Sequence, residues 1–271
     1  MGIFANHSHF LPSEGKDREG FKKFMEECGI DQSVCFAPFG LPEGLRDRYS
    51  TANHWLAQEI KADPDLFGFG TIDFSKSNIC EQVDEIANFG FKGIKIHAPQ
   101  QKIPLVGEKS FEVYRRAEEV GLFISFHTGV HFDRMQPTNT LLYDEIADSF
   151  KALKFSLEHV GGYSGFYDAM SVLINNRPWP DVHVYAGLTS ILSQRTKEWY
   201  LGIDRIREIY WQLGEDREIF GTDFPWQDVK TTKLTINMLK NDLDLSAEAK
   251  EKLFGGNLRA AIGLMANDIN I

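Results

Sequence analysis

The sequence has few cysteines, no long apolar run and no excess of basic residues, and each shortage excludes a class of protein. Its three cysteines, Cys28, Cys35 and Cys80, lack C-x-x-C spacing, so we expect reduced thiols in a cytoplasmic protein. No apolar run approaches the roughly 18 residues of a membrane span, and no basic and apolar leader opens the chain. The net charge of −10 argues against nucleic acid and anionic membrane surfaces as partners.

A Gly-rich phosphate-binding string is also missing. Neither G-x-G-x-x-G nor a P-loop follows the first expected strand, which disfavours a nucleotide-binding fold. The 271 residues fit one α/β barrel of about 250 residues as well as two average domains. With 21 phenylalanines, the chain has enough bulk for one large core.

Short apolar segments alternate with segments of helical periodicity along the whole chain. We expect strands at 2–9, 33–37, 66–72, 93–97, 122–127, 154–159, 182–185 and 218–223, and helices at 16–28, 46–62, 79–88, 110–119, 141–153, 166–175, 198–213, 232–239 and 247–254. This alternation is typical of parallel strands joined by helices. An open doubly wound sheet shows the same alternation, but such a sheet usually carries a Gly-rich loop that this sequence lacks. We therefore predict an α/β fold with a single (β/α)8 TIM barrel over 1–271.

Histidines gather at the ends of the expected strands. His7-Ser8-His9 closes the first strand, where residues i and i+2 point to one side and both imidazoles would converge. Later strands end at four more metal-capable side chains, His97, His127, His159 and Asp223. If side chains alternate strictly along a strand, the last residue of three of these strands faces inward together with the residues two and four before it. These inward-facing sets are Phe123, Ser125 and His127; Phe155, Leu157 and His159; and Ile219, Gly221 and Asp223. Because a barrel carries its chemistry on these strand ends, the pattern indicates a metal site.

Five strings carry a resemblance to a known family. They are His7-Ser8-His9, Phe126-His127-Thr128-Gly129, Glu158-His159-Val160-Gly161-Gly162, Gly221-Thr222-Asp223-Phe224-Pro225-Trp226 and Gly256-Asn257-Leu258-Arg259. In this order they resemble the amidohydrolase superfamily, and within it the amidohydrolase-related family that includes aminocarboxymuconate semialdehyde decarboxylases. The resemblance implies a (β/α)8 barrel with a divalent metal held by His7, His9, His127 and Asp223. It also implies His159 as a polar catalytic group.

Two positions depart from the family pattern. Such families usually carry an acid two residues before the first histidine, and here that residue is Ala5. Binuclear relatives bridge two metals through a carboxylated lysine that ends strand four. Here His97 stands at that end and Lys95 lies one strand repeat earlier, which favours a single metal.

The implied ligand set has a definite chemistry. Three neutral imidazoles and one carboxylate suit Zn²⁺ best, and Mn²⁺ or Fe²⁺ nearly as well, with one position open for water. Zinc lowers the pKa of its water from about 15.7 to about 7. We expect Asp223 to take a proton from that water, and His159 to donate a hydrogen bond to the substrate oxygen.

Three further residues are expected to bind substrate. His97 ends the fourth strand, where it binds substrate or hydrogen-bonds a neighbouring loop. Arg134 lies in the long loop after the fifth strand, where it could clamp a carboxylate bidentately or stay solvated. Trp226 follows Asp223, and either walls the pocket or packs under the last helix.

Three functions are compatible with these residues. The first expectation is a metal-dependent hydrolase acting on an amide, lactone or related bond of a small, polar, carboxylated molecule. The alternative is a lyase, namely a non-oxidative decarboxylase or hydratase that uses the same metal. A binding protein without catalysis is the third. The sequence leaves a homo-oligomer open, because outer barrel helices form interfaces without a sequence signature.

Overall fold

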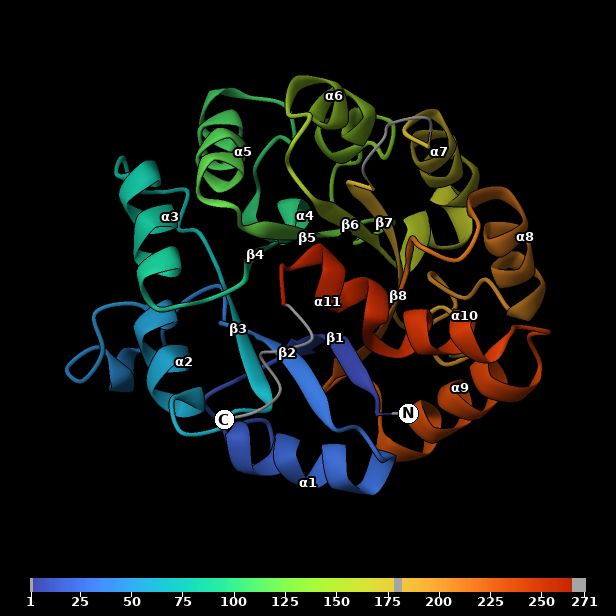
Figure 1. Ribbon diagram of the computed structural model, residues 1–271. Helices are drawn as coiled ribbons and strands as arrows, with labels where there is room; N and C mark the ends of the chain where they lie inside the picture. The colour runs from blue at the N-terminus through green and yellow to red at the C-terminus, as the bar shows by residue number, and fades with distance from the viewer. Residues whose placement is uncertain (1, 178–181, 265–271) are drawn as a thin grey trace.

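The fold is an eight-stranded parallel barrel surrounded by helices (Figure 1). The structure is a computed structural model that describes residues 2–177 and 182–264. The strands are β1 (Phe4–His9), β2 (Gln32–Phe36), β3 (Leu66–Gly70), β4 (Gly93–Ile96), β5 (Phe123–His127), β6 (Phe155–Glu158), β7 (Val184–Leu188) and β8 (Glu218–Phe224). Each strand pairs with its sequence neighbour, and β8 closes onto β1. The predicted (β/α)8 TIM barrel is confirmed.

Helices follow the strands, and most of them cover the outside of the barrel. They are α1 (Arg18–Cys28), α2 (Ala52–Ile60), α3 (Ile79–Asn88), α4 (Ala98–Gln101), α5 (Glu108–Val120), α6 (Leu142–Ser149), α7 (Gly162–Asn175), α8 (Ile203–Leu213), α9 (Val229–Asn241), α10 (Ala247–Glu251) and α11 (Asn257–Ala261). Among the residues that the structure describes, no helix is long and apolar enough to cross a membrane.

Two predicted helices begin later than expected. The helix predicted at 46–62 begins at Ala52, because the Thr51 hydroxyl accepts the His54 N–H and caps the helix there. The helix predicted at 198–213 begins at Ile203, because Gly202 has a φ of 80° that a helix does not accommodate. Both predictions were wrong at the N-terminal end, where apolar periodicity alone does not locate a cap.

Two hydrophobic layers hold the barrel together. The larger lies between the strands and the outer helices. The smaller fills the barrel interior and includes Phe4, Phe36, Phe69, Phe123, Tyr185 and Ile219, together with Leu258 of α11. Asn257 anchors α11 by donating hydrogen bonds to the carbonyls of Glu215 and Glu218. Figure 1 shows α11 across one end of the barrel, which leaves the end at the carboxyl termini of the strands for chemistry.

Irregular backbone at this carboxyl end decides which side chains face the interior. The pairing of β1 with β2 shifts between Ala5 and Ser8, and His7 has a φ of 65°. Ala5 packs in the outer layer, and it is Asn6 that reaches the buried interior and hydrogen-bonds there. Left-handed φ values recur at His159 (65°) and Asp223 (61°), a strain that is common at active sites.

The inward-facing residues predicted for two strands are confirmed and those for a third are wrong. Phe123 and Ile219 lie in the interior layer, as the alternation predicts for β5 and β8. On β6, Phe155 and Leu157 instead pack in the outer layer. Glu158 therefore faces the interior of the barrel, where Ser125 and Asn6 donate to it. His159 reaches the same side only because β6 ends at Glu158 and the backbone turns left-handed at His159.

Candidate metal centre

Three predicted ligands converge at the mouth of the barrel. Nε2 of His7 lies 3.2 Å from Nε2 of His9 and 3.5 Å from Oδ1 of Asp223, and the latter two atoms are 3.9 Å apart. One ligand atom from each residue lies within 4.8 Å of the others. Two imidazole nitrogens and a carboxylate at this spacing match the ligands of a first-row divalent metal.

The electrostatics of the three residues also fit a cation. Burial, more than any other factor, lowers the pKa of His7 and of His9 well below 6.5, so both rings are neutral near pH 7. Burial raises the pKa of Asp223 to about 6, although Ser190 Oγ donates to its Oδ2 at 2.6 Å. The two imidazoles and the carboxylate therefore provide lone pairs and carry no positive charge of their own.

His127 ends β5 beside this group but is not a member of it. Its ring lies 4.9 Å from that of His159 between centroids, and its Nε2 is buried without a hydrogen-bond partner among the described residues. A buried polar atom without a partner is costly, so a ligand at this nitrogen would relieve the cost. Metal ligation by His127 therefore stays a prediction.

His159 lies against the metal-ligand candidates in a single defined tautomer. Its Nδ1 donates to the carbonyl oxygen of Thr189 at 2.8 Å, and its ring stacks on Trp199 with centroids 5.1 Å apart. Because a carbonyl oxygen only accepts, the neutral ring carries its proton on Nδ1 and offers a lone pair on Nε2. Burial lowers the pKa of His159 to about 4. The neutral ring can therefore accept a hydrogen bond from substrate, whereas the donation predicted from the sequence requires the protonated ring.

Lys95 and Glu158 bring two further charged groups into the barrel interior. Neither side chain is exposed to solvent, and Lys95 Nζ lies 5.2 Å from the centroid of the Phe36 ring without a hydrogen-bond partner among the described residues. Burial lowers the pKa of Lys95 to about 8, although the charges of Glu158 and Asp223 act against that shift. The strand-end pattern of the sequence predicts no role for Glu158. A carboxylate at the end of a fully buried strand was the signal for it.

The three predicted substrate-binding residues have different surroundings. The His97 ring lies 6.0 Å from that of Phe39 and 4.3 Å from that of His131, beside His127. Arg134 is exposed and borders a groove of about 260 Å³ that Lys102 also lines. Trp226 is 59% exposed, so it does not pack under the last helix. Of the three, the structure brings only His97 into contact with the other site histidines.

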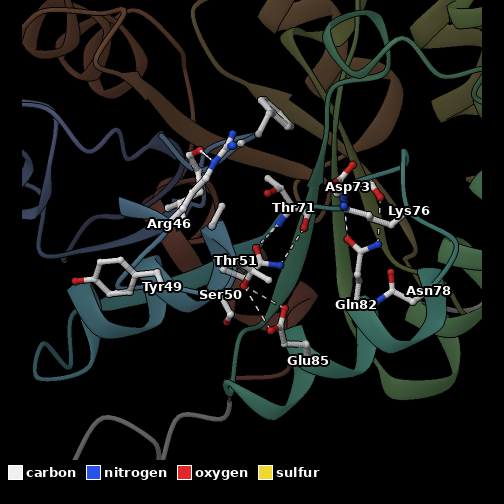
Figure 2. A pocket seen from close by; sticks show the side chains of 15 residues that line it. Arg46, Tyr49, Ser50, Thr51, Thr71, Asp73, Lys76, Asn78, Gln82 and Glu85 are labelled. Atoms are coloured by element: carbon white, nitrogen blue, oxygen red, sulfur yellow. Dashed lines mark hydrogen bonds between the residues drawn. The ribbon is translucent and has the colours of Figure 1, made fainter. Parts of the chain in front are cut away.

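A polar cleft of about 610 Å³ lies beside the centre, between the loops that follow β2 and β3. Figure 2 shows Arg46 and Lys76 on opposite sides of this cleft, with Thr71 between them. Phe39 lines the cleft, and its ring also lies 6.5 Å from that of His9. The cleft is thus one aromatic ring away from the candidate metal ligands.

Comparisons with known proteins identify the fold and the family. The sequence model of a family described as amidohydrolase matches residues 37–264. No match was found among curated proteins. An uncharacterised TIM-barrel protein from Bordetella bronchiseptica is 19% identical with a TM-score of 0.76, over 97% of this chain and 99% of the other. A 5-carboxyvanillate decarboxylase from Novosphingobium aromaticivorans is 18% identical with a TM-score of 0.71, over 97% and 96%.

A 2,6-dihydroxybenzoate decarboxylase from Rhizobium is 15% identical with a TM-score of 0.68, over 97% of this chain and 99% of the other. At these identities the structural likeness shows the fold, and the family rests on the sequence match over 37–264. The resemblance drawn from the histidine strings is thereby confirmed. The chain belongs to the amidohydrolase family.

Proposed function

We propose that the protein is a metal-dependent, non-oxidative decarboxylase of a small carboxylated molecule. The observation that carries the proposal is the convergence of His7, His9 and Asp223 at the barrel mouth. The 5-carboxyvanillate and 2,6-dihydroxybenzoate decarboxylases with the same fold support this lyase reading over the hydrolysis that we expected first. The amidohydrolase family match keeps hydrolysis as the second candidate.

His7, His9 and Asp223, together with His127, are the residues that would hold one divalent ion. When bound, such an ion supplies a Lewis acid that polarises substrate oxygens. Zinc suits the ligand set, and manganese has independent support because the 5-carboxyvanillate decarboxylase was solved with manganese. We propose one ion per chain, either zinc or manganese.

His159 and Asp223 would then have different roles in decarboxylation. The neutral His159 ring would accept a hydrogen bond from a substrate hydroxyl through Nε2 and orient the substrate. The bond between the substrate carbon and its carboxyl group breaks, CO₂ leaves, and the electron pair stays on the carbon. Asp223 would take a proton from a water molecule and pass it to this carbon.

Binding of the rest of the substrate is proposed for His97, Arg134 and Trp226, as the sequence predicts. The polar cleft adds Arg46 and Lys76 as cationic side chains that suit an anionic group. The cytoplasm remains the proposed location, supported by the three free thiols of Cys28, Cys35 and Cys80. Assembly into a homo-oligomer also stays a proposal.

A paired substrate screen on metal-reconstituted protein tests the function. Protein loaded with Mn²⁺ or Zn²⁺ is offered hydroxylated aromatic carboxylates, with release of CO₂ as the readout. The same samples are offered lactones and amides, with acid release as the readout. The proposal expects CO₂ release that the chelated protein lacks. Lactone or amide hydrolysis without any CO₂ release would replace decarboxylation by the second candidate.

A further inference from the structure

The carboxylate of Glu158 is buried beneath the candidate metal ligands and held by four donors. Asn6 Nδ2 and Ser125 Oγ donate to Oε1 at 2.9 and 3.1 Å, and Ser156 Oγ donates to the same oxygen. Thr189 Oγ1 donates to Oε2 at 2.8 Å. These donors come from β1, β5 and β6 and from the residue that follows β7, so the carboxylate is fixed from several sides. A buried carboxylate with this many donors is held as an acceptor in one orientation.

The remaining contact of this carboxylate is with His7. Oε2 of Glu158 lies 3.0 Å from Nδ1 of His7, an ion-pair distance, and that nitrogen has no hydrogen-bond partner among the described residues. Because a carboxylate carries negative charge and only accepts, its proximity favours the tautomer of His7 with the proton on Nδ1. The lone pair of Nε2 then faces Oδ1 of Asp223, 3.5 Å away. This is the tautomer in which His7 can bind a metal.

Two glycines leave the room that this arrangement needs. A Cβ on Gly187 of β7 would lie 2.4 Å from Oε2 of Glu158. A Cβ on Gly221 of β8 would lie 2.2 Å from Thr189 Oγ1 and 3.1 Å from the Cβ of His7. Any side chain at these positions would displace the carboxylate or its donor. The barrel interior is therefore shaped around the contact between Glu158 and His7.

Glu158 also links His7 to the other side of the site through its backbone. Its carbonyl oxygen accepts from Thr128 Oγ1, and that hydroxyl in turn accepts from the Gly161 N–H at 2.7 Å. Thr128 follows His127 in the chain, and His159 follows Glu158. Glu158 thus contacts His7 on β1 through its side chain and the segments after β5 and β6 through its backbone, and His127 and His159 lie at those strand ends.

We propose that Glu158 is the positioning residue of the metal centre, which holds the Nε2 atom of His7 toward the metal. The inference rests on the proposed metal-dependent function and deepens it. Ala5 packs in the outer layer, so the acid that the family usually places before the first histidine has no counterpart on β1. The carboxylate that contacts His7 comes instead from the far side of the barrel, at the end of β6.

Metal affinity of Glu158→Gln is the primary test. The variant keeps the shape of the side chain but removes the charge that holds the Nδ1 proton of His7. We expect the Kd for Mn²⁺ and for Zn²⁺, measured by competition with a chelator, to rise about 10- to 100-fold, the usual cost of losing a group that orients a ligand. Nitrogen-15 NMR of the metal-free protein gives a second readout, since His7 should lose its pure Nδ1–H form in the variant.

Glu218→Gln provides the matched control. Glu218 is equally buried but begins β8, at the end of that strand away from Asp223. We expect its Kd for either metal and its His7 tautomer to equal those of the wild type. An equal loss in both variants would assign the effect to general damage of the barrel and overturn the inference.

Each remaining outcome also decides the question. A folded Glu158→Gln protein that binds metal with the wild-type Kd overturns the positioning role. Should that variant fail to fold, Thr189→Val removes only the donor to Oε2 and should still weaken metal binding by a few-fold, whereas an unchanged Kd would overturn the role. A wild-type protein that binds neither metal rejects the proposed function itself, which keeps the two failures distinguishable.

Discussion

His97 lies face to face with His127, with ring centroids 3.8 Å apart and ring planes at 8°. Nδ1 of His97 accepts the Gln100 N–H at 3.3 Å and so caps α4. Burial lowers the pKa of His97 well below 6.5, so the ring that covers His127 is neutral near pH 7. His97 is therefore placed to support His127, whose Nε2 is without a hydrogen-bond partner among the described residues.

Replacing these two stacked histidines should separate a metal ligand from its support. In His127→Ala we expect metal affinity and activity to fall together, by more than the 10- to 100-fold typical of an orienting group, and excess metal to restore part of the activity. In His97→Phe, which keeps the stacking surface, we expect close to one metal per chain. Elemental analysis after dialysis checks both. A His127→Ala protein with a full metal complement would remove His127 from the ligand set.

His159 should behave as a substrate-orienting group. In His159→Asn we expect the metal to stay near one per chain while kcat/KM falls by about 10²-fold, the usual cost of misplacing a substrate by about 1 Å. The control is Trp199→Phe, which keeps an aromatic ring against His159 and should cost far less. If His159→Asn instead loses its metal and added zinc rescues it, His159 is a ligand.

The fold was predictable because it depends on patterns that repeat along the chain. Eight apolar strands and their helices lie within a few residues of the predicted ranges, since apolar periodicity reports burial directly. The later starts at Ala52 and Ile203 depend on a single cap and a single glycine φ. Apolar periodicity contains no information about either.

The convergence of three candidate ligands was predictable from the sequence, but the packing around them was not. His7, His9 and Asp223 converge as their strand-end positions predict. The sequence does not reveal the contact of Glu158 with His7, because strict alternation places His159 on the inward side of β6 and Glu158 on the outward side. The left-handed backbone at His159 allows both side chains to face the interior. The hydrogen bonds to Glu158 join β1, β5 and β6, which no local pattern relates.

Thiol reactivity should follow burial. Cys80 is exposed, whereas Cys28 and Cys35 are buried, and burial raises the pKa of Cys28 to about 11 and that of Cys35 well above 9.0. We expect a thiol reagent at pH 8 to modify Cys80 quickly and the other two only after unfolding. Because all three thiols are free, reductant should leave the Tm unchanged, and a large drop would reveal a disulfide.

Titration of Glu218 should make the free energy of unfolding depend on pH, and the substitution Glu218→Gln should remove this dependence. Burial raises its pKa to about 8 from 4.5, and neither carboxylate oxygen has a hydrogen-bond partner among the described residues. Between pH 4.5 and about 8 the folded state holds a proton on Glu218 that the unfolded state has released. The contribution of Glu218 to the free energy of unfolding is therefore complete below pH 4.5 and is lost as pH rises through 8. The charge that appears then is buried beside Tyr210, and the positive charge of Arg217 acts on it.

Glu218→Gln keeps the neutral form at every pH. We therefore expect the variant and the wild type to unfold at similar urea concentrations at pH 5, and the variant to be more stable at pH 9 by a few kcal/mol, since each pKa unit is worth about 1.4 kcal/mol. Taking the difference between the two proteins cancels the titration of all other groups. A difference that stays constant from pH 5 to pH 9 would mean that Glu218 does not hold its proton in the folded protein.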